Sequence, residues 1–162
     1  MSQSRQRKTL TAIGIVLVLL VSLWFLRHLF FPAWVKLTYH KDVKLIGPKA
    51  LKDSRQAVLL DTRMPEEYAV SHLQNARFVG FDNFELSLIE DLPKDTLIIT
   101  YCAIGYRSDR IAKQLIDAGY TNVHNLHGGI FNWKNLNYPV YKDDQQVEAV
   151  HPFSSFWEIW LR

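Results

Sequence analysis

The sequence predicts an α/β fold in which helices cover both faces of a parallel sheet. Short apolar runs end at polar or reactive residues, and most are followed by a segment with the periodicity or the end signals of a helix. Such alternation is typical of a parallel sheet, because parallel neighbours need a crossover connection. The chain has 162 residues, 48% of them hydrophobic, which suits one packed domain and an appendage.

The strongest strand prediction is the apolar run 97–101, which leads directly into a cysteine. Residues 57–60 form a similar run that ends at Asp61. Pro65 opens a helix with acids in its first turn, where the helix dipole favours negative charge. Residues 108–118 predict an amphipathic helix that stops at Gly119. Further strands are expected over 43–46, 76–80 and 123–126, and further helices over 48–53, 84–90 and 129–133.

An uncharged apolar segment precedes these elements. Residues 10–26 hold 17 positions without a charged side chain, and the apolar stretch continues past Arg27 to residue 31. A helix of about 20 residues crosses the core of a bilayer, so we predict a transmembrane helix over residues 10–31. Residues 1–9 would form a basic tail and residues 32–42 a linker. A cleaved signal peptide and a buried core helix are the alternatives, but the segment has neither a small-residue cleavage site nor an amphipathic stripe.

The basic residues are unevenly placed along the chain. Four of the 19 lie in residues 1–31, which hold no acid, and the rest of the chain has 15 bases and 16 acids. A folded part without excess positive charge argues against nucleic-acid binding. The compact cluster before the apolar segment favours a cytoplasmic N-terminus. We therefore expect a single-pass membrane protein with an extracytoplasmic (periplasmic) domain, and the cytoplasmic face is the alternative.

Cys102 is the only cysteine, which excludes an intramolecular disulfide and a zinc site of four cysteines. It follows a strand and precedes Gly105, Arg107 and a helix, at the sheet edge where α/β proteins bind ligands. Backbone N–H groups of such a loop and the helix start favour a thiolate. Arg107 adds a cation with a forked donor set. The alternative is an ordinary buried cysteine at a strand end.

Four segments resemble, in order, the rhodanese homology domain, over about residues 43–141. They are LLDTRMPEEY at 59–68, SHLQNA at 71–76, YCAIGYRS at 101–108 and LHGGIFNW at 126–133, and YPV at 138–140 resembles the closing segment. Serine and asparagine replace two glycines of the family's second segment. The resemblance implies a rhodanese-like α/β domain with a central parallel sheet flanked by helices, here preceded by one transmembrane helix.

The resemblance also implies a sulfurtransferase. Cys102 would take sulfane sulfur from thiosulfate or a persulfide, and a thiol or a protein would accept it from the Cys102 persulfide. The anion would be bound by the residues that follow, Ala103, Ile104, Gly105, Tyr106 and Arg107. Phosphatase relatives on this fold have arginine at the seventh loop position, where this chain has Ser108. A non-catalytic rhodanese-like module that tethers partners at the membrane is the second hypothesis.

One departure from the family concerns the donor. Many members have arginine directly after the cysteine, and Ala103 stands there in this chain. The pocket mouth should therefore be less positive, so we expect thiosulfate, a dianion, to be a poorer donor than a protein persulfide. No cofactor is expected, and no metal, because His124 and His127 lack a convincing ligand set.

Other polar residues near the expected loop have structural interpretations. Asp61 and Arg63 are interpreted as an ion pair or turn bond, with a supporting role at the site as the alternative. His72 is interpreted as a packed, hydrogen-bonded histidine rather than a proton shuttle. Gly128 and Gly129 should allow a tight turn close to Cys102.

The tail over residues 142–162 ends in an aromatic stretch. Its large apolar residues fall on one helical face: Phe153, Phe156, Trp157, Trp160 and Leu161. A helix this short is marginal alone in water, so we expect it to dock. It would pack either on its own domain or in the membrane interface.

Overall fold

The computed structural model describes residues 3–54, 56–158 and 160–161, with the backbone alone for residues 3–9, 24–25, 27–34 and 155–156. The chain divides into two units, Met1–Leu37 and Thr38–Arg162, which are described separately.

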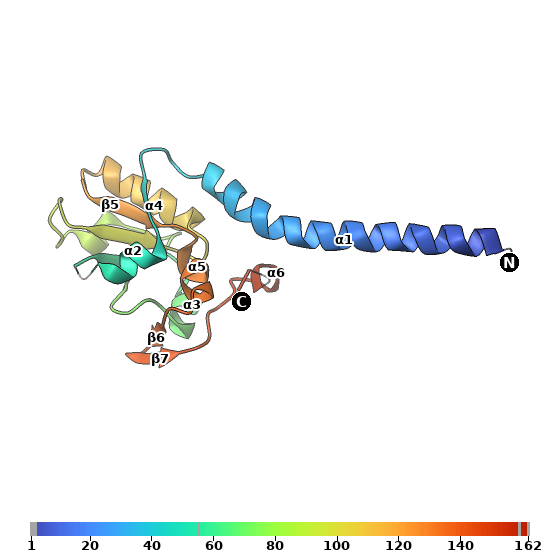
Figure 1. The fold of residues 1–162 in the computed structure, drawn as a ribbon. Coiled ribbons are helices and arrows are strands. Elements are labelled where there is room, and N and C mark those ends of the chain that lie inside the picture. The colour runs from blue at the N-terminus through green and yellow to red at the C-terminus, as the bar shows by residue number, and fades with distance from the viewer. Residues whose placement is uncertain (1–2, 55, 159, 162) are drawn as a thin grey trace. The chain divides into compact units, whose positions relative to one another are not determined.

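A single long helix, α1 (Gln3–Leu37), makes up the first unit (Figure 1). The linker expected from residue 32 begins only after Leu37, because the residues that follow Pro32 include good helix formers such as Ala33 and Lys36. Within the described residues, no helix is both long and apolar enough to cross a bilayer. The transmembrane helix expected over residues 10–31 is therefore not confirmed.

A parallel sheet of five strands lies at the centre of the second unit, in the order β1-β5-β4-β2-β3. The strands are β1 (Lys44–Ile46), β2 (Val58–Asp61), β3 (Arg77–Phe78), β4 (Ile98–Tyr101) and β5 (Val123–Leu126). The strand expected over 76–80 is reduced to two residues. Its chain turns away because the N–H groups of Val79 and Gly80 both donate to the carbonyl of Asp61, at 2.9 and 3.2 Å.

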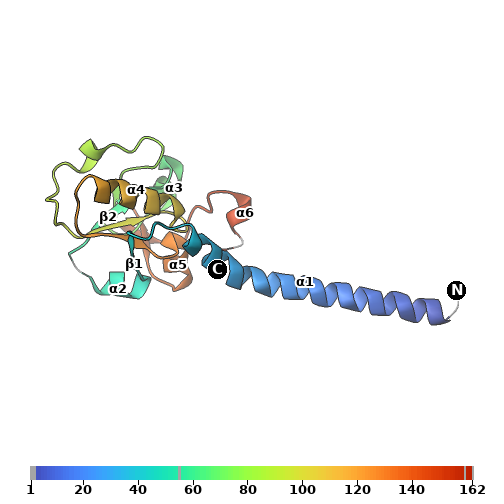
Figure 2. The same cartoon turned by 90° about the horizontal axis from the view of Figure 1, so that it is seen from above.

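Helices cover both faces of this sheet (Figure 2). One face carries α4 (Tyr106–Asp117) and the 3-10 helix η1 (Leu86–Ile89), and the other carries α2 (Pro48–Asp53) and α5 (Gly129–Asn135). The alternation of side chains along β4 sets these layers, since Ile98 packs with Ile111 of α4 while Ile99 packs with Ile130 of α5. The fold class expected from the sequence is confirmed.

Two helices differ from the sequence prediction. The segment expected to be helical over 84–90 forms only the four-residue η1. Helix α4 starts at Tyr106 rather than at Ser108, because Gly105 takes a left-handed conformation (φ 99°) directly before it and so starts the helix earlier. Helix α3 (Pro65–Val70) begins at the proline, as expected.

The C-terminal segment packs on the second unit. β6 (Val140–Lys142) and β7 (Gln145–Val147) form an antiparallel hairpin, and α6 (Ser155–Glu158) follows as one short turn. Trp157, Trp160 and Leu161 contact the core cluster on the α5 side of the sheet. Asn135 Nδ2 of α5 donates to the carbonyl of Trp160 at 2.8 Å. The tail was expected to pack either on its own domain or in the membrane interface. The described residues of the tail pack on their own domain.

Candidate active site

Cys102 lies directly after the central strand β4 and opens the Cys102 loop, residues 102–107. Its side chain is buried, with 1% of the residue exposed. The N–H of Gly105 donates to Sγ at 3.1 Å, which brings a backbone dipole onto the sulfur. Helix α4 begins at the next residue, so its N-terminal end lies beside the thiol. Both features stabilise negative charge on sulfur.

Hydrogen bonds from outside the loop hold Gly105 in place. Asn125 Nδ2 at the end of β5 donates to the Gly105 carbonyl at 2.9 Å, and Ser108 Oγ donates to Asn125 Oδ1 at 2.7 Å. Tyr39 donates its hydroxyl proton to the Ile104 carbonyl at 2.8 Å. Burial raises the pKa of Tyr39 and the charge of Cys102 raises it further, so the hydroxyl stays protonated as a donor.

The start of α5 supports the same loop from the other side. The N–H of Ile130 donates to the Cys102 carbonyl at 2.9 Å, and that of Phe131 donates to the Ala103 carbonyl at 3.1 Å. Gly129, at φ 57°, lies against these two carbonyls. The structure thus has the close turn expected at Gly128 and Gly129.

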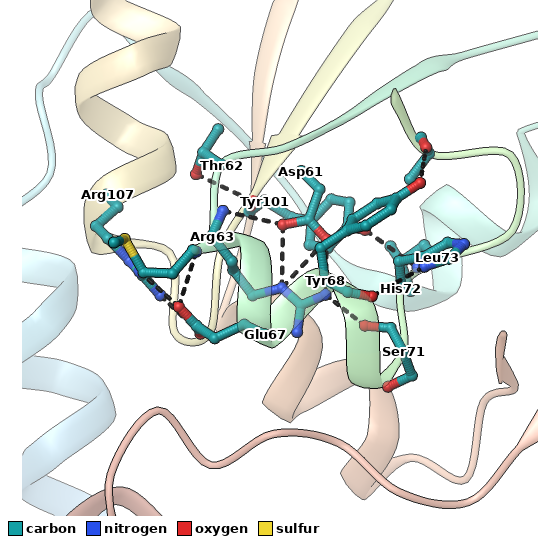
Figure 3. Close-up of polar contacts among 12 residues, drawn as sticks. Asp61, Thr62, Arg63, Glu67, Tyr68, Ser71, His72, Leu73, Tyr101 and Arg107 are labelled. Carbon is teal, nitrogen blue, oxygen red and sulfur yellow. Dashed lines mark hydrogen bonds and ion pairs between the residues drawn. The ribbon is translucent and has the colours of Figure 1, made fainter. Parts of the chain in front are cut away.

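Arg107, in the first turn of α4, forms a two-pronged ion pair with Glu67 of α3 (Figure 3). Its Nη1 and Nη2 donate to Glu67 Oε2 and Oε1 at 2.7 and 2.9 Å. The Glu67 side chain is 1% exposed and that of Arg107 13%. Burial lowers the pKa of Arg107, but the hydrogen bonds to Glu67 and the charge of Cys102 outweigh it and raise that pKa. Arg107 therefore remains a cation whose charge is matched by a carboxylate.

Asp61 and Arg63 form a second, fully buried pair close by (Figure 3). The Arg63 guanidinium donates to both Asp61 oxygens at 2.7–3.1 Å, and its Nη2 also donates to the Ser71 carbonyl at 2.6 Å. Burial lowers the pKa of Arg63, and the adjacent Asp61 carboxylate more than offsets this, so the net shift is upward. This is the geometry of a structural ion pair that fixes the chain between β2 and α3.

His72 is packed and hydrogen-bonded. Its ring stacks on Tyr68 with centroids 4.0 Å apart and planes 7° apart, and its Nδ1 lies 3.2 Å from the Tyr68 carbonyl oxygen. Its backbone pairs with Tyr141. These contacts anchor the β6 segment to α3, which agrees with a packing role.

The structure brings together residues that the sequence did not associate with the site. Glu67 was interpreted only as an acid favoured by the helix dipole, although its side chain pairs with Arg107. Tyr39 lies outside the expected domain, and no sequence signal marks it. Asn125 carried a usable signal, because a polar side chain at the buried end of an apolar strand needs a hydrogen-bond partner.

The arrangement around Cys102 is compatible with nucleophilic chemistry at its sulfur. Two arginines and two carboxylates lie next to the loop, and their charges cancel in pairs. Negative charge on Cys102 Sγ is stabilised by the Gly105 N–H and the helix start, and the Arg107 guanidinium also interacts with it although Glu67 matches its charge. Such a site suits a thiol that forms a covalent bond with an incoming group.

Comparison with known proteins matches the part of the chain that contains the Cys102 loop. The family model described as "Rhodanese-like domain" matches residues 48–136. The chain is 32% identical over 90 residues to a protein named "Sulfurtransferase" from Allochromatium vinosum, covering 56% of this chain and 83% of that protein. It is 27% identical over 101 residues to "Thiosulfate sulfurtransferase GlpE" of Vibrio cholerae, covering 62% and 92%.

Solved structures give the same result. A rhodanese-related protein from Thermoplasma volcanium matches with a TM-score of 0.54 and 27% identity, over 60% of this chain and 97% of that one. Other curated relatives are much longer, and the match spans only 25% and 23% of two of them. The residues that match the family model include Cys102, both ion pairs and the starts of the helices around the loop. The chain belongs to the rhodanese-like domain family.

Proposed function

We propose that the protein is a sulfurtransferase that carries sulfane sulfur on Cys102. The observation that supports this most directly is the hydrogen bond from the Gly105 N–H to Cys102 Sγ, inside a loop closed by α4 and α5. A thiolate in such a loop is a strong nucleophile, and the persulfide formed on it is an anion that the same N–H group can bind. Sulfurtransferase relatives at 27–32% identity support the same class of reaction.

The proposed cycle has two displacements at sulfur. Cys102 thiolate attacks the outer sulfur of a donor R–S–S⁻; the new S–S bond forms as the donor's S–S bond breaks, and R–S⁻ leaves. With thiosulfate, sulfite leaves instead. An acceptor nucleophile then attacks the outer sulfur of the Cys102 persulfide, and the Cys102 thiolate leaves with the bonding electron pair. The cycle needs no external oxidant or reductant, because each step transfers zero-valent sulfur between nucleophiles.

A persulfide is the donor that the charges favour over thiosulfate. Ala103 adds no cation at the loop, and the charge of Arg107 is matched by Glu67. A dianion gains less from such a site than from one with an unpaired arginine. We therefore expect the kcat/KM for a small organic persulfide to exceed that for thiosulfate by about tenfold or more, which corresponds to about 1.4 kcal/mol.

The test is sulfur transfer by the full chain in detergent, with cyanide as acceptor and thiocyanate formation as readout. The wild-type protein should turn over with a persulfide donor, and Cys102→Ser should fall to the uncatalysed rate because serine cannot carry sulfane sulfur. Thiocyanate formed equally fast by Cys102→Ser would contradict the proposal. No turnover by folded wild-type protein with either donor would favour the alternative, a non-catalytic module that tethers partners.

For localisation we propose that residues 10–31 anchor the chain in a membrane with the domain outside the cytoplasm. The support is the sequence alone, 17 uncharged residues preceded by a basic cluster. After cell fractionation, the full chain should stay in the membrane pellet through an alkaline carbonate wash, and a variant without residues 1–37 should not. Release of the full chain by that wash would contradict the anchor.

A further inference from the structure

The C-terminal segment brings an aromatic ring onto the arginine of the Cys102 loop. The Phe153 ring lies over the Arg107 guanidinium, with 4.9 Å between Cζ and the ring centroid. The segment is held to the domain on both sides of this contact. Ser71 Oγ donates to the Ala149 carbonyl at 2.6 Å before it, and Asn135 donates to the Trp160 carbonyl at 2.8 Å after it.

Phe153 adopts a conformation that this residue type seldom takes. Its φ of 66° is in the left-handed region, which costs an aromatic residue on the order of 1 kcal/mol or more. Burial of the side chain does not offset this cost in free energy, because 47% of the residue stays exposed. The sequence pattern placed Phe153 on one helical face with Trp157, but α6 begins only at Ser155, after it. The Phe153 ring packs on the Arg107 guanidinium, whereas Trp157 packs on the core.

The contact changes what Arg107 offers to a donor. Glu67 takes both terminal nitrogens of the guanidinium, and the Phe153 ring lies on one face of it. Only 13% of the Arg107 side chain is exposed. A dianion that approached the Arg107 guanidinium would have to displace the Phe153 ring. It would also have to lose bound water beside that apolar ring. The half-exposed ring is in turn an apolar surface for the carbon group of a donor.

We infer that Phe153 is a specificity-determining residue, which disfavours small dianionic donors and favours persulfides whose sulfur is attached to an apolar or aromatic carbon group. This inference rests on the proposed function and extends it to a residue outside the region that matches the family model, 48–136. The ring contributes through its contact with Arg107 and with the donor, while Cys102 remains the nucleophile.

The test compares kcat/KM for thiosulfate and benzyl persulfide in the full chain and in Phe153→Gly. Glycine accepts the positive φ, so this variant removes the ring without adding strain and should keep its melting temperature. We expect its thiosulfate-to-benzyl persulfide ratio to rise at least tenfold. Phe153→Leu, which keeps an apolar cover without a ring face, should fall between Phe153→Gly and wild type.

Leu86→Ala is the matched control, because it removes an equally exposed apolar side chain from η1, on the α4 side of the sheet. Its donor ratio should equal that of wild type. An unchanged ratio in Phe153→Gly, with wild type active, would overturn the inference and leave the proposed function standing. Wild type inactive with both donors would overturn the proposed function and this inference with it.

Discussion

Replacing Gly129 with alanine should collapse the Cys102 loop and cost about 3 kcal/mol or more in the free energy of unfolding. A Cβ there would overlap the Cys102 carbonyl oxygen and lie 2.5 Å from that of Ala103. Both are backbone atoms, so no rotamer change relieves the overlap. The estimate adds about 1 kcal/mol for alanine at φ 57° to about 1 kcal/mol for each hydrogen bond lost at Ile130 and Phe131.

Gly119→Ala separates the steric effect from the backbone effect. Gly119 also has a positive φ, 89°, but an added Cβ there meets nothing within 4 Å. Gly119→Ala should therefore lower the free energy of unfolding by only about 1 kcal/mol, which is the effect of the left-handed conformation alone. Urea unfolding of both variants gives the comparison, and sulfur transfer should be lost only in Gly129→Ala. Equal destabilisation by the two substitutions would show that α5 does not hold the Cys102 loop.

Glu67→Gln should have the second-largest effect and lower the free energy of unfolding by about 3 kcal/mol, since the largely buried Arg107 charge loses its carboxylate partner. It also weakens the start of α3, where Glu67 Oε2 accepts from the Met64 N–H at 3.0 Å. Thermal unfolding measures the loss. An additional readout distinguishes this from a purely structural effect: an unmatched Arg107 should make thiosulfate a relatively better donor.

Glu66→Gln is the control for that variant. It removes the same charge from the same turn of α3, but Glu66 is exposed and, among the residues that the structure describes, forms no ion pair with Arg63 or Arg107. Its stability should stay within about 0.5 kcal/mol of wild type, as is usual for surface substitutions. A double variant, Glu67→Gln with Arg107→Met, should regain part of the lost stability, because the unpaired charge is then gone. No recovery would contradict the ion-pair explanation.

The sequence predicted those parts of the site that depend on local order. Cys102, Gly105 and Arg107 follow one strand within six residues, so their proximity comes from a single strand–loop–helix unit. The strand order was not predictable in the same way, and neither was the shortening of β3, which depends on two N–H groups bonding to Asp61 across the sheet.

Side chains that reach the loop from distant segments were missed for the same reason. Glu67 is 40 positions from Arg107 and Tyr39 is 65 from Ile104. Their pairing is decided by the packing of α3 and of the segment before β1, and periodicity carries no information about it. Phe153 was assigned to a helical face, whereas the tertiary contact with Arg107 accompanies a backbone conformation that no helix contains.

The central claim, that Cys102 carries sulfur covalently, is tested most directly by intact-protein mass spectrometry. The full chain would be incubated with a small persulfide donor, freed of excess donor and compared with Cys102→Ser. We predict a gain of one sulfur, about 32 Da, that cyanide reverses and that the variant lacks, as expected for a reactive thiolate. An unmodified mass in folded protein whose Cys102 still reacts with an alkylating agent would contradict the account.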